Sequence, residues 1–240
     1  MPTSAESPEG EPSKATTLAS AILLACAGGL LDAVVYLGHG HVFANAMTGN
    51  VIFLGIAVLG HDWKQIIPHL VPLVGFLAGV TSSKHMRFRL SEPSVLLLGL
   101  TFESLALFAL GWLPNSFSHI AFTAIIAFVA AFQVASFRRV ERFSYNSTFV
   151  TGNLRDMAEG LYDATSASDP ETREKGLSKA VDLGLICLCF LIGAILGAWA
   201  APRFGNHSLW FAEPFLLAVA LHSFRHYLSR ESRTSTLPSK

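Results

Sequence analysis

The sequence is poor in charged residues. Only 14% of its 240 residues are Asp, Glu, Lys or Arg, against about 25% in an average soluble domain. Acidic and basic residues balance, so the net charge is zero, and no basic surface for nucleic acid is expected. The three cysteines, Cys26, Cys187 and Cys189, lie within apolar segments and lack the spacing of a zinc or redox motif. These shortages exclude a soluble globular domain and a secreted disulfide scaffold.

Catalytic signatures are also missing. The sequence has no nucleophile elbow, Walker loop, dinucleotide fingerprint or helical H-E-x-x-H motif. The run His39-Gly40-His41 lacks a second group of ligands at a suitable spacing, which favours an exposed loop over a metal site. We therefore expect no enzyme, no metal and no cofactor.

Apolar residues are abundant instead, at 51% of the chain, and the mean hydropathy is +0.46. Five long stretches contain no charged residue at all: 15–31, 33–61, 65–83, 104–137 and 183–202. A bilayer core about 30 Å thick is crossed by roughly 20 apolar helical residues. The composition therefore predicts an all-α integral protein of the cell membrane that crosses the bilayer several times.

Six segments are long enough to span: 17–37, 66–82, 94–113, 119–137, 180–201 and 209–228. Two further elements, 43–60 and 147–163, are too short or too polar to cross. We predict a disordered tail over 1–16, a first membrane repeat over 17–113, a second over 114–229 and a C-terminal tail over 230–240.

The division into repeats rests on paired motifs. Thr48-Gly49-Asn50 in the first short element reappears as Thr151-Gly152-Asn153 in the second. Each half also carries a G-x-x-x-G pattern, which lets membrane helices approach closely. We expect its four glycines to pack helices together: Gly75, Gly79, Gly193 and Gly197.

Charge decides whether the short elements cross. If both are re-entrant, all Lys and Arg residues except Lys64 and Arg203 fall on one side, as the positive-inside rule requires of the cytoplasmic side. Six spans with both termini cytoplasmic follow. Because each half then has three spans, the second half enters upside down, and the fold is predicted to be two inverted three-helix repeats.

Several of these residues carry a family resemblance. Gly28-Gly29-Leu30-Leu31-Asp32, followed by Met47-Thr48-Gly49-Asn50, resembles the YoaK-like family of multipass membrane proteins (domain of unknown function 1275). Arg138-Arg139 and Thr151-Gly152-Asn153-Leu154 are similar to the second signature of that family. Ala46 departs from the pattern, which often has Asn at that position. The resemblance implies a membrane fold and no established activity.

Two ionisable residues lie inside predicted spans. Asp32 and Glu103 would each be costly to bury without a partner or a water-filled cavity. A pathway or coupling role is one reading of both residues. Alternatively, Asp32 caps re-entrant backbone or reaches the headgroups, and Glu103 makes a structural hydrogen bond to a neighbouring helix.

The Thr-Gly-Asn motifs predict breaks in the helices. Gly permits unusual backbone angles, and Thr and Asn cap the helix that follows. Two breaks entering from opposite sides place polar groups near the midplane, as in transporters with broken helices. We predict that six side chains converge there on a substrate or an ion: Asp32, Thr48, Asn50, Glu103, Thr151 and Asn153. The alternative is that the motifs are structural turns.

Arg138 and Arg139 follow the fourth predicted span. A topogenic cluster that faces lipid headgroups is the favoured role, and a gate is the other.

The sequence thus favours a small-solute transporter or permease over a non-transporting membrane scaffold or assembly factor. An intramembrane enzyme that uses Asp32 with His39 or His41 is a weaker third reading. The partners expected are the lipid bilayer and a small solute or ion, with homo-oligomerisation left open.

Overall fold

A computed structural model describes residues 17–137, 139–140, 143–144 and 150–234. Its first half contains four helices: α1 (Leu18–Gly38), α2 (Met47–Leu59), α3 (Trp63–Arg87) and α4 (Glu92–Gly111). Its second half contains α5 (His119–Ser136), α6 (Val150–Ser166), α7 (Pro170–Phe204), the 3-10 helix η1 (Gly205–Phe211) and α8 (Glu213–Thr234). The described strands are only two residues each, β1 (Arg139–Val140) and β2 (Phe143–Ser144), and pair antiparallel.

Side-chain caps begin several of these helices. Thr17 Oγ1 accepts the Ser20 N–H at the start of α1, and Asp62 accepts the Lys64 N–H at the start of α3. Asp169 accepts the Thr172 N–H, and Pro170 follows it at the first position of α7. Such caps satisfy N–H groups that have no partner inside the helix.

Five stretches are long and apolar enough to cross a membrane: Leu18–Gly38, Trp63–Arg87, Ser94–Gly111, His119–Ser136 and Pro170–Arg225. The last of these joins α7, η1 and most of α8 into one stretch. The expected class, an all-helical multipass membrane protein, is confirmed at this level. The finer division into six spans is not given by length and hydropathy alone.

The second half differs in detail from the expected boundaries. α7 begins at Pro170 and runs for 35 residues, although only 180–201 was expected to be a span. Its polar first turns are stabilised by the Asp169 cap and by an ion pair between Lys175 and Glu171, 2.5 Å apart. α8 likewise continues beyond residue 229 to Thr234. The expected tail over 1–16 lies outside the described residues.

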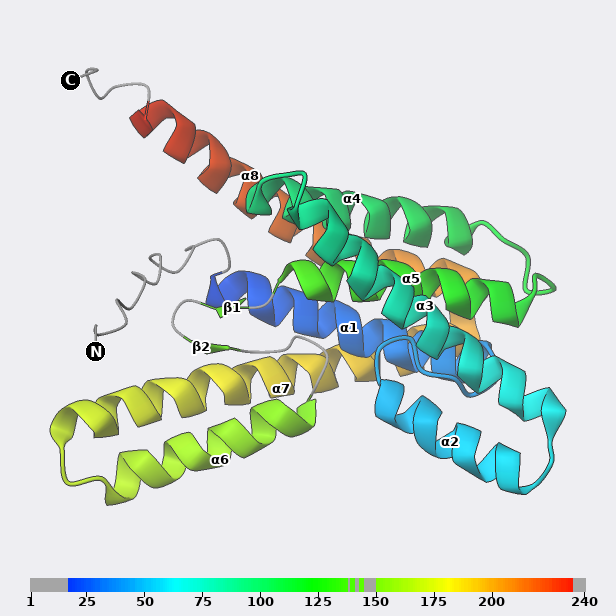
Figure 1. Ribbon diagram of the computed structural model, residues 1–240, viewed down its shortest axis with the longest axis horizontal. Coiled ribbons are helices and arrows are strands. Elements are labelled where there is room, and N and C mark those ends of the chain that lie inside the picture. The colour runs from blue at the N-terminus through cyan, green and yellow to red at the C-terminus, as the bar shows by residue number, and fades with distance from the viewer. Residues whose placement is uncertain (1–16, 138, 141–142, 145–149, 235–240) are drawn as a thin grey trace, which may run out of the picture.

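Contacts between the helices follow a regular scheme. The most extensive are α1 with α7 and α3 with α5. α2 packs on α3, and α6 packs on α7. α4 packs on α5, and α8 packs on α1. These six contacts form three equivalent pairs when α1, α2, α3 and α4 are exchanged with α5, α6, α7 and α8, respectively. For example, the contact of α1 with α7 becomes the contact of α5 with α3. Figure 1 shows α2 and α6 extending toward opposite ends of the bundle.

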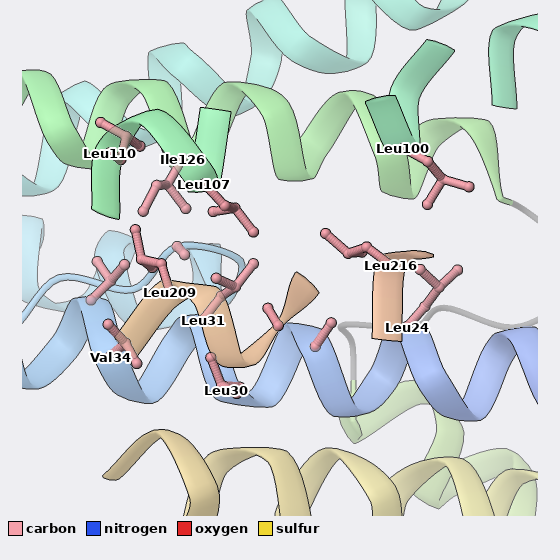
Figure 2. Packing of buried hydrophobic residues seen from close by; sticks show 14 of the residues in the cluster. Leu24, Leu30, Leu31, Val34, Leu100, Leu107, Leu110, Ile126, Leu209 and Leu216 are labelled. Atoms are coloured by element: carbon pink, nitrogen blue, oxygen red, sulfur yellow. The ribbon is translucent and has the colours of Figure 1, made fainter. Parts of the chain in front are cut away.

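The core is apolar and draws on both halves. Figure 2 shows leucine, isoleucine and valine side chains from α1, α4, α5, η1 and α8 meeting between the helices: Leu24, Leu30, Leu31, Val34, Leu100, Leu107, Leu110, Ile126, Leu209 and Leu216. Large apolar side chains also cover the outside, for example Leu188, Leu191 and Ile195 on α7. A surface of this kind suits contact with lipid rather than water.

Glycines bring α1 and α7 into backbone contact. A Cβ atom added at Gly193 would collide with the Cys26 carbonyl oxygen. One added at Gly197 would lie 2.5 Å from the Leu30 carbonyl oxygen. Neither position has room for a side chain, so the close crossing depends on glycine.

α3 and α5 cross in the same way. A Cβ added at Gly75 would lie 2.8 Å from the Ala124 carbonyl oxygen, and one at Gly79 would collide with the carbonyl oxygen of Phe128. All four glycines of the two G-x-x-x-G patterns therefore lie at crossings between the halves.

The two crossings share one register. The Ala33 methyl group would lie 3.1 Å from a Cβ at Gly197, and the Ala131 methyl group would lie 3.0 Å from a Cβ at Gly79. In both interfaces the first glycine faces one backbone carbonyl, and the second faces the carbonyl four residues later and an alanine methyl group.

Candidate functional site

Asp32 holds the entry to α2. Its side chain is buried, and its Oδ1 accepts the N–H groups of Asn45, at 2.7 Å, and of Ala46, at 3.4 Å. The Asn45 amide in turn donates to the Gly28 carbonyl oxygen at 3.5 Å. Asp32 Oδ2 has no hydrogen-bond partner within the residues that the structure describes. Asp32 Oδ1 therefore holds the backbone at the entry to α2, whereas Oδ2 has no such role among the described residues.

These bonds fix where α2 starts along α1. Gly28 lies ten residues before Gly38, the last residue of α1, which corresponds to about 15 Å along a helix. That is about half of a hydrocarbon core roughly 30 Å thick. The non-helical residues 39–46 therefore turn back along α1, and α2 begins near its middle.

Asn50 closes the same loop. Its Oδ1 accepts the Phe43 N–H at 3.0 Å, and its Nδ2 donates to the Phe43 carbonyl oxygen at 2.9 Å. The amide thus replaces a backbone partner for a non-helical residue, as buried backbone requires. Asp32 and Asn50 come together around residues 43–46, but Thr48 is exposed and lies outside this group.

The second motif lies elsewhere. Asn153 is buried at the start of α6, whereas Thr151 is exposed. α6 runs back along α7, and Cβ atoms added at Gly160 and Gly176 would each lie 2.7 Å from the other residue's carbonyl oxygen. Between α2 and α6 themselves there is no extensive contact. The expected convergence of the two Thr-Gly-Asn motifs is therefore wrong for the threonines, and the first motif is satisfied within its own half.

Glu103 belongs to a different contact. It is buried on α4 and interacts electrostatically with Glu213 at the start of α8, which accepts a hydrogen bond from Ser104. Glu103 Oε2 has no hydrogen-bond partner among the described residues. Glu103 thus lies at the contact between α4 and α8 rather than beside the loop that Asp32 holds. Arg138 and the side chain of Arg139 lie outside the described part of the structure, so their expected role stays a prediction.

A histidine that sequence reasoning assigned to an exposed loop is buried. His39 is only 3% exposed at the end of α1, and its ring stacks on Phe122 with centroids 3.6 Å apart. Its Nδ1 lies 3.0 Å from His119 Nδ1, and its Nε2 lies 3.0 Å from Asn206 Oδ1. Burial, reinforced by the His119 imidazole, lowers the pKa of His39 to about 4. The partners are 80 and 167 residues away, so no local pattern reveals them.

Two cavities meet at His39. The larger, about 350 Å³, is lined by His39, Gly40, Val42, Gln65, Pro68, Ser118, His119, Ile120 and Thr123. The smaller, about 210 Å³, is lined by Val34, Gly38, His39, Asn115, Ala201, Gly205 and Asn206. Both open at the end of the bundle where α1 ends and α5 begins.

Comparison with known proteins gives a family and no function. A family model described as "Protein of unknown function (DUF1275)" matches residues 20–222. The UPF0700 transmembrane protein YoaK of Bacillus subtilis (strain 168) is 26% identical over 194 residues, which cover 78% of this chain and 85% of that protein. No solved structure matches the chain. The match over most of the helical region shows that the chain belongs to the DUF1275 family of multipass membrane proteins.

Proposed function

We propose that the protein is a small-solute transporter or permease. Its six spanning helices are α1, α3 and α4 in one repeat and α5, α7 and α8 in an inverted second repeat. α2 and α6 are re-entrant elements that start inside the bilayer and leave on opposite sides.

The packing scheme supports this arrangement. The contacts of α1 with α7 and α8, of α3 with α2 and α5, of α4 with α5 and of α6 with α7 map onto one another when the halves are exchanged, and α2 and α6 extend toward opposite ends (Figure 1). The tryptophans agree, because Trp63 begins α3, Trp112 ends α4, and Trp199 and Trp210 lie where α7 meets η1. All four are at the end where α1 ends, as an interfacial aromatic belt would be.

The observation that carries the transport proposal is the buried start of α2. Non-helical backbone at membrane depth is tolerated where protein or a water-filled cavity satisfies it. Here Asp32 satisfies it with one carboxylate oxygen, and the other has no hydrogen-bond partner among the described residues. An intramembrane acid of this kind is typical of a coupling-ion or proton site.

The topology is tested by labelling single cysteines from each side of the membrane. A cysteine at Asp62, between α2 and α3, should react from outside, and one at Ser168, between α6 and α7, should react only from the cytoplasm. Reaction of both from the same side would refute the inverted repeat.

Transport is tested in proteoliposomes by solid-supported-membrane recording. Jumps in pooled metabolites, with and without a proton or sodium gradient, should evoke currents that Asp32→Asn abolishes. Asp62→Asn is the matched control, because Asp62 also caps a helix but is exposed. No current above protein-free liposomes with any pool, or equal currents in wild type and Asp32→Asn, would count against the proposal.

A membrane scaffold is the second candidate. The local hydrogen bonds between Asn50 and Phe43 favour it, because they engage the Asn50 amide in holding the loop rather than in binding a solute. A scaffold would give silent proteoliposomes with correctly inserted protein.

A further inference from the structure

The hydrogen bonds around His39 have a fixed direction. Asn206 Nδ2 donates to the Leu113 carbonyl oxygen at 2.9 Å, which leaves Asn206 Oδ1 facing His39. An amide oxygen can only accept, so His39 Nε2 must carry a hydrogen. Because buried His39 is neutral, its Nδ1 is then an acceptor. It follows that His119 Nδ1 donates to His39.

These bonds fix where His119 carries its hydrogen when its imidazole is in the neutral form. Such an imidazole carries one hydrogen, and that of His119 lies on Nδ1, facing His39. Nε2 is then a lone-pair acceptor, and it makes no hydrogen bond within the described part of the chain. His119 is exposed and lines the larger cavity.

Two hydroxyl groups of that cavity each make one local hydrogen bond. Ser118 Oγ accepts the Ala121 N–H, and Thr123 Oγ1 donates to the Ile120 carbonyl oxygen. The Gln65 side chain makes no such bond among the described residues, so its amide can both donate and accept. No carboxylate, ammonium or guanidinium group is among the lining residues.

We infer that this cavity binds a small uncharged molecule with an N–H donor next to a carbonyl acceptor, as in an amide. The donor bonds to His119 Nε2 and the acceptor to the Gln65 amide, with Val42, Pro68 and Ile120 against the apolar part. A net charge on the ligand would gain nothing here, because no opposite charge lines the cavity. This site is about 15 Å along α1 from the start of α2, and it does not depend on whether the protein transports.

Nitrogen-15 NMR of histidine-labelled protein in detergent tests the inference at neutral pH. His39 should be in the Nε2–H form and His119 in the Nδ1–H form, a reading that requires no substitution. Finding His119 in the Nε2–H form would overturn the directional chain and the site with it.

Two probes test binding. N-methylacetamide has the N–H donor and N,N-dimethylacetamide lacks it, while both keep the carbonyl. The first should shift the His119 Nε2 signal in a saturable way, with an apparent Kd at least about tenfold below that of the second, because one hydrogen bond is worth roughly that factor. Equal Kd values, or no saturable shift with either probe, would overturn the site.

Substitutions complete the test, read out as the probe-induced rise in melting temperature. His119→Phe should remove the rise caused by N-methylacetamide. His85→Phe is the control, because His85 is exposed in the last turn of α3 and does not line the cavity. An unchanged rise in His119→Phe would refute the assignment of the acceptor.

Discussion

The two halves of the bundle share a crossing but differ at the break that follows it. In α1 and α5 the residues that contact the glycines correspond, so that Leu30 matches Phe128 and Ala33 matches Ala131. By the same register Asp32 of the first half corresponds to Ala130 of the second. The crossing is therefore common to both halves, and the buried acid belongs to one of them. A coupling group in only one half would give the two sides of the membrane different chemistry.

The short helices differ as well. α2 contains no charged residue and exposes Val51, Ile52 and Ile56. α6 carries charges instead, and Arg155 pairs with Asp156 at 2.8 Å on its surface. The apolar element suits lipid contact, whereas the charged one suits water or headgroups. The pair thus resembles one motif adapted to two environments.

The largest expected effect tests the shared crossing. Gly193→Leu should lower the yield and the melting temperature more than Gly75→Leu. A Cβ at position 193 would lie closer to the Cys26 carbonyl oxygen than a Cβ at position 75 would lie to the Ala124 carbonyl oxygen. Overpacking of this kind costs about 1–3 kcal/mol or more. Fluorescence-detected size exclusion and thermal unfolding in detergent measure both quantities.

Gly55→Leu is the control for this pair, because a Cβ at Gly55 meets nothing within 4 Å. It should fold normally. Wild-type stability in both crossing variants would show that the halves do not need backbone contact.

The next effect tests the break. Asn50→Ala removes both hydrogen bonds to Phe43 and leaves its half-buried N–H and carbonyl without these partners. We expect a loss of about 1–3 kcal/mol. Thr48→Ala, at an exposed position of the same motif, should change stability by less than about 0.5 kcal/mol. Equal effects would mean that the loop is not held by Asn50.

A smaller effect concerns pH. The pKa of His39 is lowered to about 4 in the folded protein from an ordinary value of 6.5. Between these values the unfolded state binds more protons, so stability present above pH 6.5 should be lost as the pH falls toward 4. Melting temperatures at pH 7.5 and pH 5.0 should therefore differ less in His39→Gln than in wild type. His41→Gln, at an exposed position of the same loop, should keep the wild-type difference.

The smallest effect is expected on the surface of the hairpin formed by α6 and α7. Lys179 Nζ lies 3.6 Å from Glu159 Oε2, and the Glu159 side chain is 59% exposed. Exposed pairs contribute about 0–1 kcal/mol. Glu159→Gln should therefore leave the melting temperature nearly unchanged, and the difference from wild type should depend little on the salt concentration. A large loss would mean that the hairpin is anchored by charge rather than by Gly160 and Gly176.

The sequence predicted what depends on local composition or on repetition. Apolar stretches identified the membrane class, and the paired motifs marked α2 and α6 as unusual elements. The glycines at the crossings followed from spacing as well. The span expected over 180–201 lies within the longer helix α7, whose polar start was not predicted, because capping by Asp169 and surface ion pairs extend a helix without any apolar signal.

The site was harder to predict, because its partners are remote. Asp32 was recognised as unusual, and one of the roles proposed for it, capping of the backbone that leads into the short element, matches the bonds to Asn45 and Ala46. The grouping with Glu103 failed, since sequence alone does not say which helix faces which. His39 was placed in an exposed loop because its contacts with His119 and Asn206 join segments that no periodicity connects.

The glycine contact between α1 and α7 also sets an order of events during synthesis. The contact between the Cys26 carbonyl of α1 and Gly193 cannot form until Gly193 has left the ribosome, about 150 residues after α1 is complete. At about 5–20 residues per second, this delay is on the order of 10–30 s. During that time the narrow face of α1, with Asp32 beside it, has no permanent neighbour. The insertion machinery or the lipid must hold α1 in place until the second half arrives.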